Sequence, residues 1–236
     1  MIVFVHIPKT GGTSIRKAAA AYFSDENVLY DYGATAPLTS PLVRELLYEK
    51  DDIEGLASQM LKSNIEFLSG HFKRERYHSA LPHATFITWV RDPVDRVLSL
   101  HRHRTKTHPN TPDLEEFSRT LAFRNGIVEQ AGSEPDRYAF IGVLERHDES
   151  VARLNEIMGL DIAIRHDNDA IESHEHRPSA LAEDTGREHR PIESRILTKV
   201  KNLNGKDDAF VAAANARLSQ RPVADEPKPD ATRRLD

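Results

Sequence analysis

Short apolar runs alternate along most of the chain with longer segments of helical pattern. Each run is only a few residues long and is followed by a glycine, a proline or a charged residue, which is typical of buried strands. The runs lie at residues 2–7, 66–69, 84–90 and 138–145. The helical patterns lie at residues 13–23, 41–62, 93–104, 148–158 and 192–218. This alternation predicts an α/β fold in which helices flank a mainly parallel β-sheet, as a three-layer sandwich.

The same pattern predicts one folded domain. A chain of 236 residues is long enough to bury a core of its own, and it contains no internal repeat. We predict a single α/β domain over residues 1–218. Residues 163–191 are polar, rich in histidine and without periodicity, so they are predicted to form a loop or lid. Residues 219–236 hold three prolines and charges of both signs, which predicts a disordered tail.

Composition limits the available chemistry. The chain has no cysteine, which excludes disulfides, thiolate zinc sites and a cysteine nucleophile. No apolar stretch reaches the ~18 residues of a membrane span, and no basic segment precedes the first apolar run as it would in a secretory signal. We therefore expect a soluble, cytoplasmic protein without a membrane span, which acts through His, Lys, Arg, carboxylate or hydroxyl groups.

The net charge of −5 conceals a basic segment in the middle of the chain. Residues 71–108 contain eight Lys and Arg against three Asp and Glu, together with six of the twelve histidines. Taken alone, a charge cluster is more often a solvated face. Inside an acidic protein, however, this segment favours a small polyanion as partner over a nucleic acid, which would require a broadly basic domain.

The sequence HIPKTGGTSI, residues 6–15, follows the first predicted strand. Its two glycines allow a tight turn with N–H groups close to a ligand, and the helix that begins there directs its positive end to the same point. A turn that needs glycine for geometry alone is the alternative, but the lysine and the hydroxyls favour phosphate binding. The order is not that of a Walker A loop, because Lys9 precedes both glycines. The predicted anion-binding residues are Pro8, Lys9, Thr10, Gly11, Gly12, Thr13 and Ser14.

Basic residues also follow the next two predicted strands. His71 follows the second strand and Arg91 follows the third. Because ligands of parallel sheets bind at the carboxyl ends of the strands, we expect both residues at one edge of the sheet. Asp92 is a predicted N-cap and Pro93 takes the first helical position. Ser99 lies two turns into this helix, where it could bind a second phosphate together with Arg91.

The helix after Arg91 has one apolar and one polar face. At about 100° per residue, Val97 lies on the apolar face, whereas Arg96 and Ser99 lie on the polar face, which taken alone is more often solvated. His101 and His103 point about 200° apart on a helix and cannot chelate one metal ion from one face. A second pair, His174 and His176, lies in the predicted loop and also has a low prior as a metal site. We expect no metal.

Four segments, in order, resemble one family of enzymes: HIPKTGGTSI, SGHF, TWVRDPVDRVLSLH and FIGVLERHDES. They are similar to motifs of the sulfotransferases related to heparan sulfate 2-O-sulfotransferase and their bacterial relatives, over roughly residues 1–160. The resemblance implies a P-loop-like fold and the donor 3′-phosphoadenylyl sulfate (PAPS). It implies that residues 9–14 bind the 5′-phosphosulfate and that Arg91 and Ser99 bind the 3′-phosphate. It also implies that His71 is the catalytic base.

The resulting hypothesis is a PAPS-dependent sulfotransferase that acts on a hydroxyl, expected to belong to a saccharide, with His71 and Lys9 as catalytic residues. A P-loop kinase that uses ATP and an inactive nucleotide-binding module are the alternatives. Contacts to the acceptor are expected from variable loops at residues 24–64, 105–135 and 163–191. Asp208 and the residues after it depart from the terminal motif of the family, which leaves that correspondence open.

Overall fold

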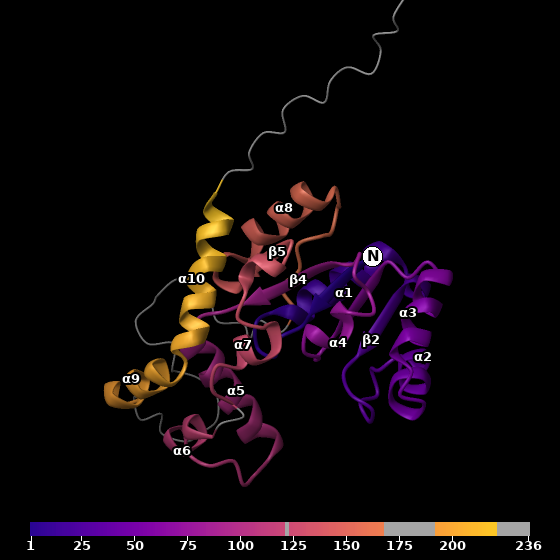
Figure 1. The fold of residues 1–236 in the computed structure, drawn as a ribbon. Coiled ribbons are helices and arrows are strands. Elements are labelled where there is room, and N and C mark those ends of the chain that lie inside the picture. The colour runs from indigo at the N-terminus through magenta and orange to yellow at the C-terminus, as the bar shows by residue number, and fades with distance from the viewer. Residues whose placement is uncertain (121–122, 168–191, 221–236) are drawn as a thin grey trace, which may run out of the picture.

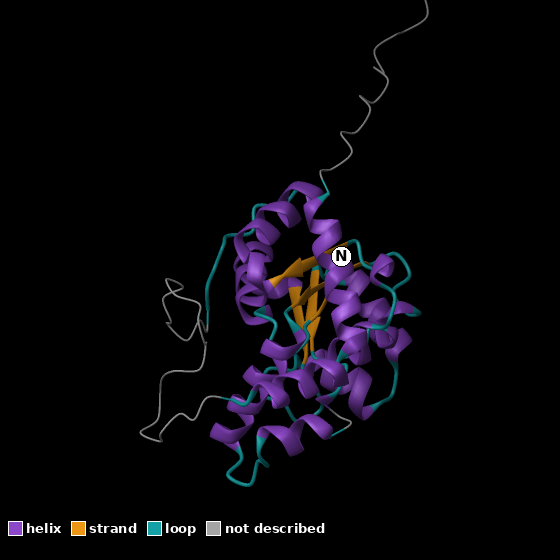
Figure 2. Ribbon diagram, turned by 90° about the vertical axis from the view of Figure 1, so that its left-hand side faces the viewer, coloured by secondary structure: helices purple, strands orange, loops and turns teal. Residues whose placement is uncertain are grey.

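A computed structural model describes residues 1–120, 123–167 and 192–220, and its centre is a five-stranded sheet (Figure 1). The strands are β1 (Ile2–Val5), β2 (Val28–Asp31), β3 (Phe67–Gly70), β4 (Thr85–Val90) and β5 (Phe140–Val143). Their order is β2-β3-β1-β4-β5, and every neighbouring pair is parallel. Helices lie on both sides of the sheet (Figure 2). The predicted α/β fold with a mainly parallel sheet is therefore confirmed.

Strand β2 was not among the predicted strands. Its four residues, VLYD, lie within the segment 24–64 that was assigned to variable loops. The strand pairs with β3 in the register Val28↔Phe67 to Asp31↔Gly70 and forms an edge of the sheet. A run this short, which ends in a tyrosine and an aspartate, shows no clear period in the sequence. Pairing with β3 supplies the backbone hydrogen bonds that stabilise it.

Helix α1 (Gly12–Phe23) follows β1 and begins directly after the glycine turn. The predicted helix 41–62 is interrupted. The structure has α2 (Pro41–Val43), which continues as a π-helical segment η2 (Arg44–Glu49), and then α3 (Ile53–Lys62). The break occurs because Asp51 has a φ of 51° and Asp52 caps α3 by accepting a hydrogen bond from the Gly55 N–H at 2.7 Å.

The other helices follow the later strands. After β3 comes the short α4 (Glu75–His78), after β4 comes α5 (Pro93–Thr107), and after β5 comes α8 (His147–Met158). Residues 105–135, assigned to a loop, include α6 (Leu114–Arg119) and α7 (Gly126–Ala131). The predicted helix 192–218 divides at Asn204 into α9 (Ser194–Leu203) and α10 (Gly205–Ser219).

Two hydrophobic cores hold these elements together. The main core surrounds the sheet, where Phe4, Phe67 and Trp89 are fully buried. A smaller core joins α5, α6 and α9 through Val97, Phe117 and Val200, and these three helices gather in the lower part of Figure 1. No helix in the described part of the chain is both long and apolar enough to cross a membrane.

Arg96 was predicted to lie on a solvated polar face of its helix, but the structure buries it. Its side chain is buried, and its Nη2 lies 3.8 Å from Asp207 Oδ2 on α10, which is also buried. Asp207 accepts hydrogen bonds from the N–H groups of Ile127 and Val128 at 3.1 and 2.9 Å. Arg96 therefore lies on the helix face that the period predicts, but α7 and α10 cover this face of α5, so it is not solvated.

Candidate functional site

The predicted site residues lie at the carboxyl edge of the four adjacent strands β3, β1, β4 and β5. The loop at residues 6–11 follows β1, His71 follows β3, and Arg91 follows β4. Hydrogen bonds connect two of these loops, since the N–H of His6 donates to the carbonyl of Gly70 at 2.9 Å. The expectation that these segments share one edge of the sheet is met.

The loop before α1 turns tightly through left-handed backbone positions. Lys9 and Gly11 have φ values of 72° and 80°, in the left-handed region. A side chain at Gly11 would place its Cβ 2.4 Å from Leu144 Cδ1, and one at Gly12 would place its Cβ 2.3 Å from His6 Cδ2. Both positions therefore require glycine. The turn brings the N-terminus of α1 to the carboxyl edge of the sheet.

The three hydroxyls of this loop have different surroundings. The Thr10 hydroxyl is buried and donates to the carbonyl of Ile7 at 2.8 Å, so it closes the turn. The Ser14 hydroxyl accepts from the Asp167 N–H at 2.8 Å and donates to the Asp167 carbonyl at 3.1 Å. Thr13 is half-buried at the start of α1, and the structure records no side-chain hydrogen bond from it to another described residue. Thr13 therefore has the hydroxyl that is most available to a ligand.

Positive charge surrounds the loop. Burial lowers the pKa of Lys9, and the charges of Arg91, Arg102 and Lys106 lower it further. Among the described residues, no carboxylate lies within 4.0 Å of any of these four cations. The Nε of Arg91 is buried and has no hydrogen-bond partner in the described part of the chain. Such a cluster of cations without carboxylates is suited to a ligand with several negative charges.

The start of α5 holds Arg91 in place. Asp92 caps the helix, as predicted, by accepting a hydrogen bond from the Asp95 N–H at 2.9 Å. The N–H of Asp92 donates to Glu145 Oε1, after β5, at 3.0 Å. Glu145 thus braces the loop that carries Arg91, a role that the sequence left open. Ser99 is half-buried in the second turn of α5, and no recorded contact brings it to Lys9.

His71 stands between the loop of β1 and the edge strand β2. Its ring packs edge-on against His6, with ring centroids 4.7 Å apart, and against Tyr32, at 4.6 Å. His6 Nδ1 lies 2.7 Å from the Tyr32 hydroxyl, which in turn lies 3.2 Å from the Ser69 hydroxyl. Tyr32 was not predicted to lie here, because the strand that precedes it was not predicted.

A buried carboxylate supports this side of the site. Asp31, at the end of β2, accepts hydrogen bonds from Tyr48 Oη at 2.6 Å, Tyr77 Oη at 2.9 Å and Arg76 Nη1 at 2.9 Å. Its carbonyl accepts from the His71 N–H at 2.9 Å. Because these partners come from β2, η2 and α4, they were not visible as a pattern in the sequence. Asp31 fixes both the backbone of His71 and the helix that follows it.

Both histidines are neutral in the folded protein near pH 7. Burial lowers the pKa of His6 well below its usual value, and the charge of Arg16, together with the charge that His71 carries when it is protonated, acts in the same direction. The side chain of His71 is exposed to solvent. Nevertheless, desolvation of its ring and the charge of Arg16 lower its pKa to about 4, although the charge of Asp31 opposes this. A neutral imidazole next to an anion-binding loop can accept a proton.

We expect the folded protein to lose stability as the pH falls from about 6.5 towards 4, because the unfolded chain then binds protons at His6 and His71 that the folded chain does not bind. Calorimetric melting temperatures should therefore fall over this range. His71→Asn should show a smaller fall than the wild type, because one of the two sites is removed. Equal falls in the two proteins would contradict the lowered pKa of His71.

The histidine pairs do not form a metal site in the described residues. His101 Nε2 contacts the carbonyl of Pro112 at 2.9 Å, and His103 lies on another side of α5. Within residues 1–120, 123–167 and 192–220, no group of three or more His, Asp or Glu is placed to hold a metal ion. His174 and His176 lie outside the described residues, as does most of the predicted lid.

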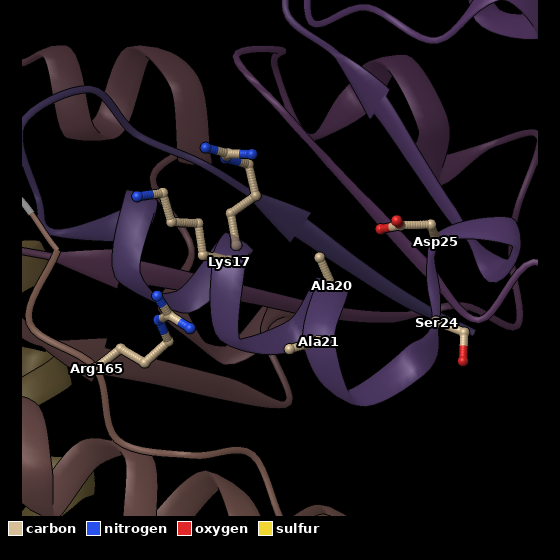
Figure 3. A pocket seen from close by; sticks show the side chains of 7 residues that line it. Lys17, Ala20, Ala21, Ser24, Asp25 and Arg165 are labelled. Carbon is tan, nitrogen blue, oxygen red and sulfur yellow. The ribbon is translucent and has the colours of Figure 1, made fainter.

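A shallow open pocket lies along the outer side of α1 (Figure 3). Lys17 and Arg165 lie at one end of it, and Ser24 and Asp25 lie at the other, with Ala20 between them. Lys9 and His71 do not line this pocket. We therefore place the candidate site by its charges and backbone geometry, because the strongest anion-binding features lie at the sheet edge.

Comparison with solved structures finds sulfotransferases. The fold is similar to that of a sulfotransferase from Alicyclobacillus acidocaldarius, with a TM-score of 0.51 and 16% identity over 93% of this chain and 98% of that chain. Mouse sulfotransferase SULT7A1 complexed with PAP gives a TM-score of 0.47 and 13% identity, over 69% of this chain and 58% of that chain. Retinol dehydratase in complex with androsterone and PAP gives a TM-score of 0.39 and 15% identity, over 69% of this chain and 60% of that chain.

The chain thus spans about three fifths of the length of SULT7A1 and of retinol dehydratase, and nearly the full length of the bacterial enzyme. A sequence search of curated proteins finds no match. The model of the sulfotransferase family matches residues 1–207, which include the glycine turn, His71, Arg91 and the start of α10. The chain therefore belongs to the sulfotransferase family.

Proposed function

We propose that this protein transfers the sulfuryl group of PAPS to a hydroxyl of a saccharide. The observation that carries the proposal is the cluster of four cations around the glycine turn, none of which has a carboxylate partner within 4.0 Å among the described residues. PAPS carries two separate phosphate positions, so it needs charge at more than one point. Family membership supports sulfuryl transfer as the reaction.

In this proposal the loop binds the 5′-phosphosulfate. Lys9 and Thr13 contribute a charge and a hydroxyl, and the N–H groups at the start of α1 point to the same anion. Arg91 and Ser99 bind the 3′-phosphate, and the unpaired Nε of Arg91 fits that role. Ser14 can bind the donor only if its hydrogen bonds to Asp167 are exchanged for bonds to the phosphate.

The reaction is an in-line displacement at sulfur. A ring nitrogen of neutral His71 accepts the proton of the acceptor hydroxyl as its oxygen bonds to sulfur. The bond between sulfur and the bridging oxygen of the 5′-phosphate breaks, and adenosine 3′,5′-bisphosphate leaves. Lys9 stabilises the charge that develops on the bridging oxygen. No electron transfer is involved, so this chain needs only to position the reactants and stabilise charge.

A saccharide is the proposed acceptor because the motifs resemble those of carbohydrate-type enzymes related to heparan sulfate 2-O-sulfotransferase. A kinase that uses ATP is the alternative enzyme. It has no use for Arg91, which lies one strand away from the glycine turn, and its lysine would follow the glycines. An inactive nucleotide-binding module differs from both because it would bind the nucleotide without turnover.

We expect calorimetric titration to show tight binding of adenosine 3′,5′-bisphosphate and much weaker binding of 5′-AMP and of ATP with magnesium. Arg91→Ala should weaken binding of the bisphosphate by roughly 30-fold or more, the ratio that corresponds to about 2 kcal/mol for a lost charge-assisted contact. Its affinity for 5′-AMP should hardly change, since this ligand lacks the 3′-phosphate. Preference for ATP would contradict the proposed donor.

The matched control for that titration is Arg104→Ala. Arg104 lies on α5, the helix that follows Arg91, with its guanidinium 5.1 Å from the ring of Phe123. It should leave the preference for the bisphosphate unchanged. An equal loss in Arg91→Ala and Arg104→Ala would mean that α5 attracts the nucleotide only through its overall charge.

A further inference from the structure

Building on the proposed function, we propose that Arg16 forms a second oxyanion subsite on the side of the site where the rings of Tyr30 and Tyr32 connect it to His71. This subsite is separate from the cluster around Lys9, and it would bind a sulfate or carboxylate group. The group could be the sulfuryl group that the donor brings to the acceptor, or an acidic group of the acceptor itself. Both are small oxyanions that a guanidinium recognises through paired hydrogen bonds.

Arg16 is held above a row of aromatic rings that leads to His71. Its guanidinium lies 5.5 Å from the ring centroid of Tyr30. The rings of Tyr30 and Tyr32 are 6.4 Å apart, and those of Tyr32 and His71 are 4.6 Å apart. The planar guanidinium is thus positioned by a cation–π contact. Arg16 comes from α1 and the tyrosines come from the edge strand β2, so the arrangement depends on the fold.

Arg16 lacks the carboxylate partner that its neighbouring cations have. Asp167 pairs with both Lys17 and Arg165, at 2.9 and 2.8 Å. Arg76, on α4, pairs with Asp31 at 2.9 Å. Within the described residues no carboxylate lies within 4.0 Å of Arg16, although Figure 3 shows Asp25 at the far end of the same pocket. The guanidinium of Arg16 therefore carries an uncompensated charge.

The cations of the site form two electrostatic groups. The charges that act most strongly on Lys9 are those of Arg91, Arg102 and Lys106. The charges that act on His71 are those of Arg16 and Asp31. The negative charge of Asp31 is satisfied by three side-chain donors, whereas the positive charge of Arg16 remains available. An oxyanion that binds on this side of the site would therefore find its free cation in Arg16 and would act on His71 through its charge.

The test uses protein loaded with adenosine 3′,5′-bisphosphate, so that the cluster around Lys9 is occupied. The probes are sodium sulfate, methyl β-D-glucuronide and methyl β-D-glucoside at constant ionic strength, and the readout is the imidazole signal of His71 by NMR. Sulfate or glucuronide should shift this signal and raise the pKa of His71, and the glucoside should not. We expect Arg16→Gln to weaken this binding at least tenfold, and Arg16→Lys to retain part of it.

Lys17→Gln is the matched control, because Lys17 is the next residue on α1 and is paired with Asp167. It should leave the response of His71 unchanged. A response to sulfate assigns the subsite to the transferred group, and a response to glucuronide alone assigns it to the acceptor. Two results would overturn the proposal. The first is that His71 does not respond to sulfate and responds equally to glucuronide and glucoside. The second is that His71 responds equally in the wild type and in Arg16→Gln.

Failure of this proposal is distinguishable from failure of the proposed function. If the bisphosphate does not bind, the donor assignment is wrong, but sulfate can still be titrated against the free protein with His71 as the readout. If the bisphosphate binds and no oxyanion affects His71, the donor assignment stands and the subsite at Arg16 does not exist. Unchanged affinity for the bisphosphate in Arg16→Gln shows that the variant is folded.

Discussion

Replacing His71 with alanine should lower kcat by ~10²–10⁴-fold, the range for the loss of a general base. The donor should still bind, because the cations of the nucleotide site lie around the loop of β1 and the start of α5. The reason for the large effect is that His71 is neutral, with its pKa lowered to about 4. The measurement combines turnover of PAPS with calorimetric binding of adenosine 3′,5′-bisphosphate.

His78→Ala is the control for this substitution. His78 lies exposed at the end of α4, on the same connection between β3 and β4. We expect its loss to change neither turnover nor donor binding. If His71→Ala lost donor binding in step with its activity, His71 would be a nucleotide-binding or structural residue rather than the base.

Most of the sheet was predictable from the sequence for a simple reason. Strands β1, β4 and β5 are buried on both faces, so they read as continuous apolar runs bounded by polar residues. The residue that follows a parallel strand lies at the ligand-binding edge of the sheet. His71 and Arg91 could therefore be placed beside the glycine turn before any coordinates were known.

The features that the sequence did not reveal depend on contacts between distant segments. Asp31 reads as an ordinary polar residue, but it is buried where β2, η2 and α4 meet. Arg96 has the period of a solvated face and becomes buried only because α10 covers it. Ser14 bonds to Asp167, which lies 153 positions later in the chain. Helical and strand periods report local structure, so they cannot show which segment covers a given face.

These contacts also change how the site is understood. The predicted site combined donor-binding residues in the loops after β1 and β4 with His71, which follows β3. The structure adds the surroundings of His71, which include Asp31 at the end of the edge strand β2, Tyr32 directly after it, and Arg16 on α1. His71 thus lies between the cations around the glycine turn and a side rich in tyrosine. Determinants of the acceptor should be sought on β2 and α1, in regular structure as well as in loops.

The largest loss of stability is expected for Asp207→Ala. Removal of this carboxylate leaves Arg96 buried without its charge partner and leaves two N–H groups of α7 without their acceptor. Breaking a buried ion pair on one side costs about 3–5 kcal/mol. The pKa of Arg96 is already lowered by burial and is supported only by Asp207. Denaturant unfolding, analysed at constant m-value, should show this loss.

Asp208→Ala is the matched control, because Asp208 is the neighbouring residue on α10 and is only half-buried. Its loss should change the free energy of unfolding by no more than about 0.5 kcal/mol. A second variant separates charge from hydrogen bonding, since Arg96→Met with Asp207→Ala removes the unpaired charge and still leaves the N–H groups of α7 without their acceptor. This double variant should be more stable than Asp207→Ala. If it is not, the hydrogen bonds to α7, rather than the uncompensated charge of Arg96, account for the loss.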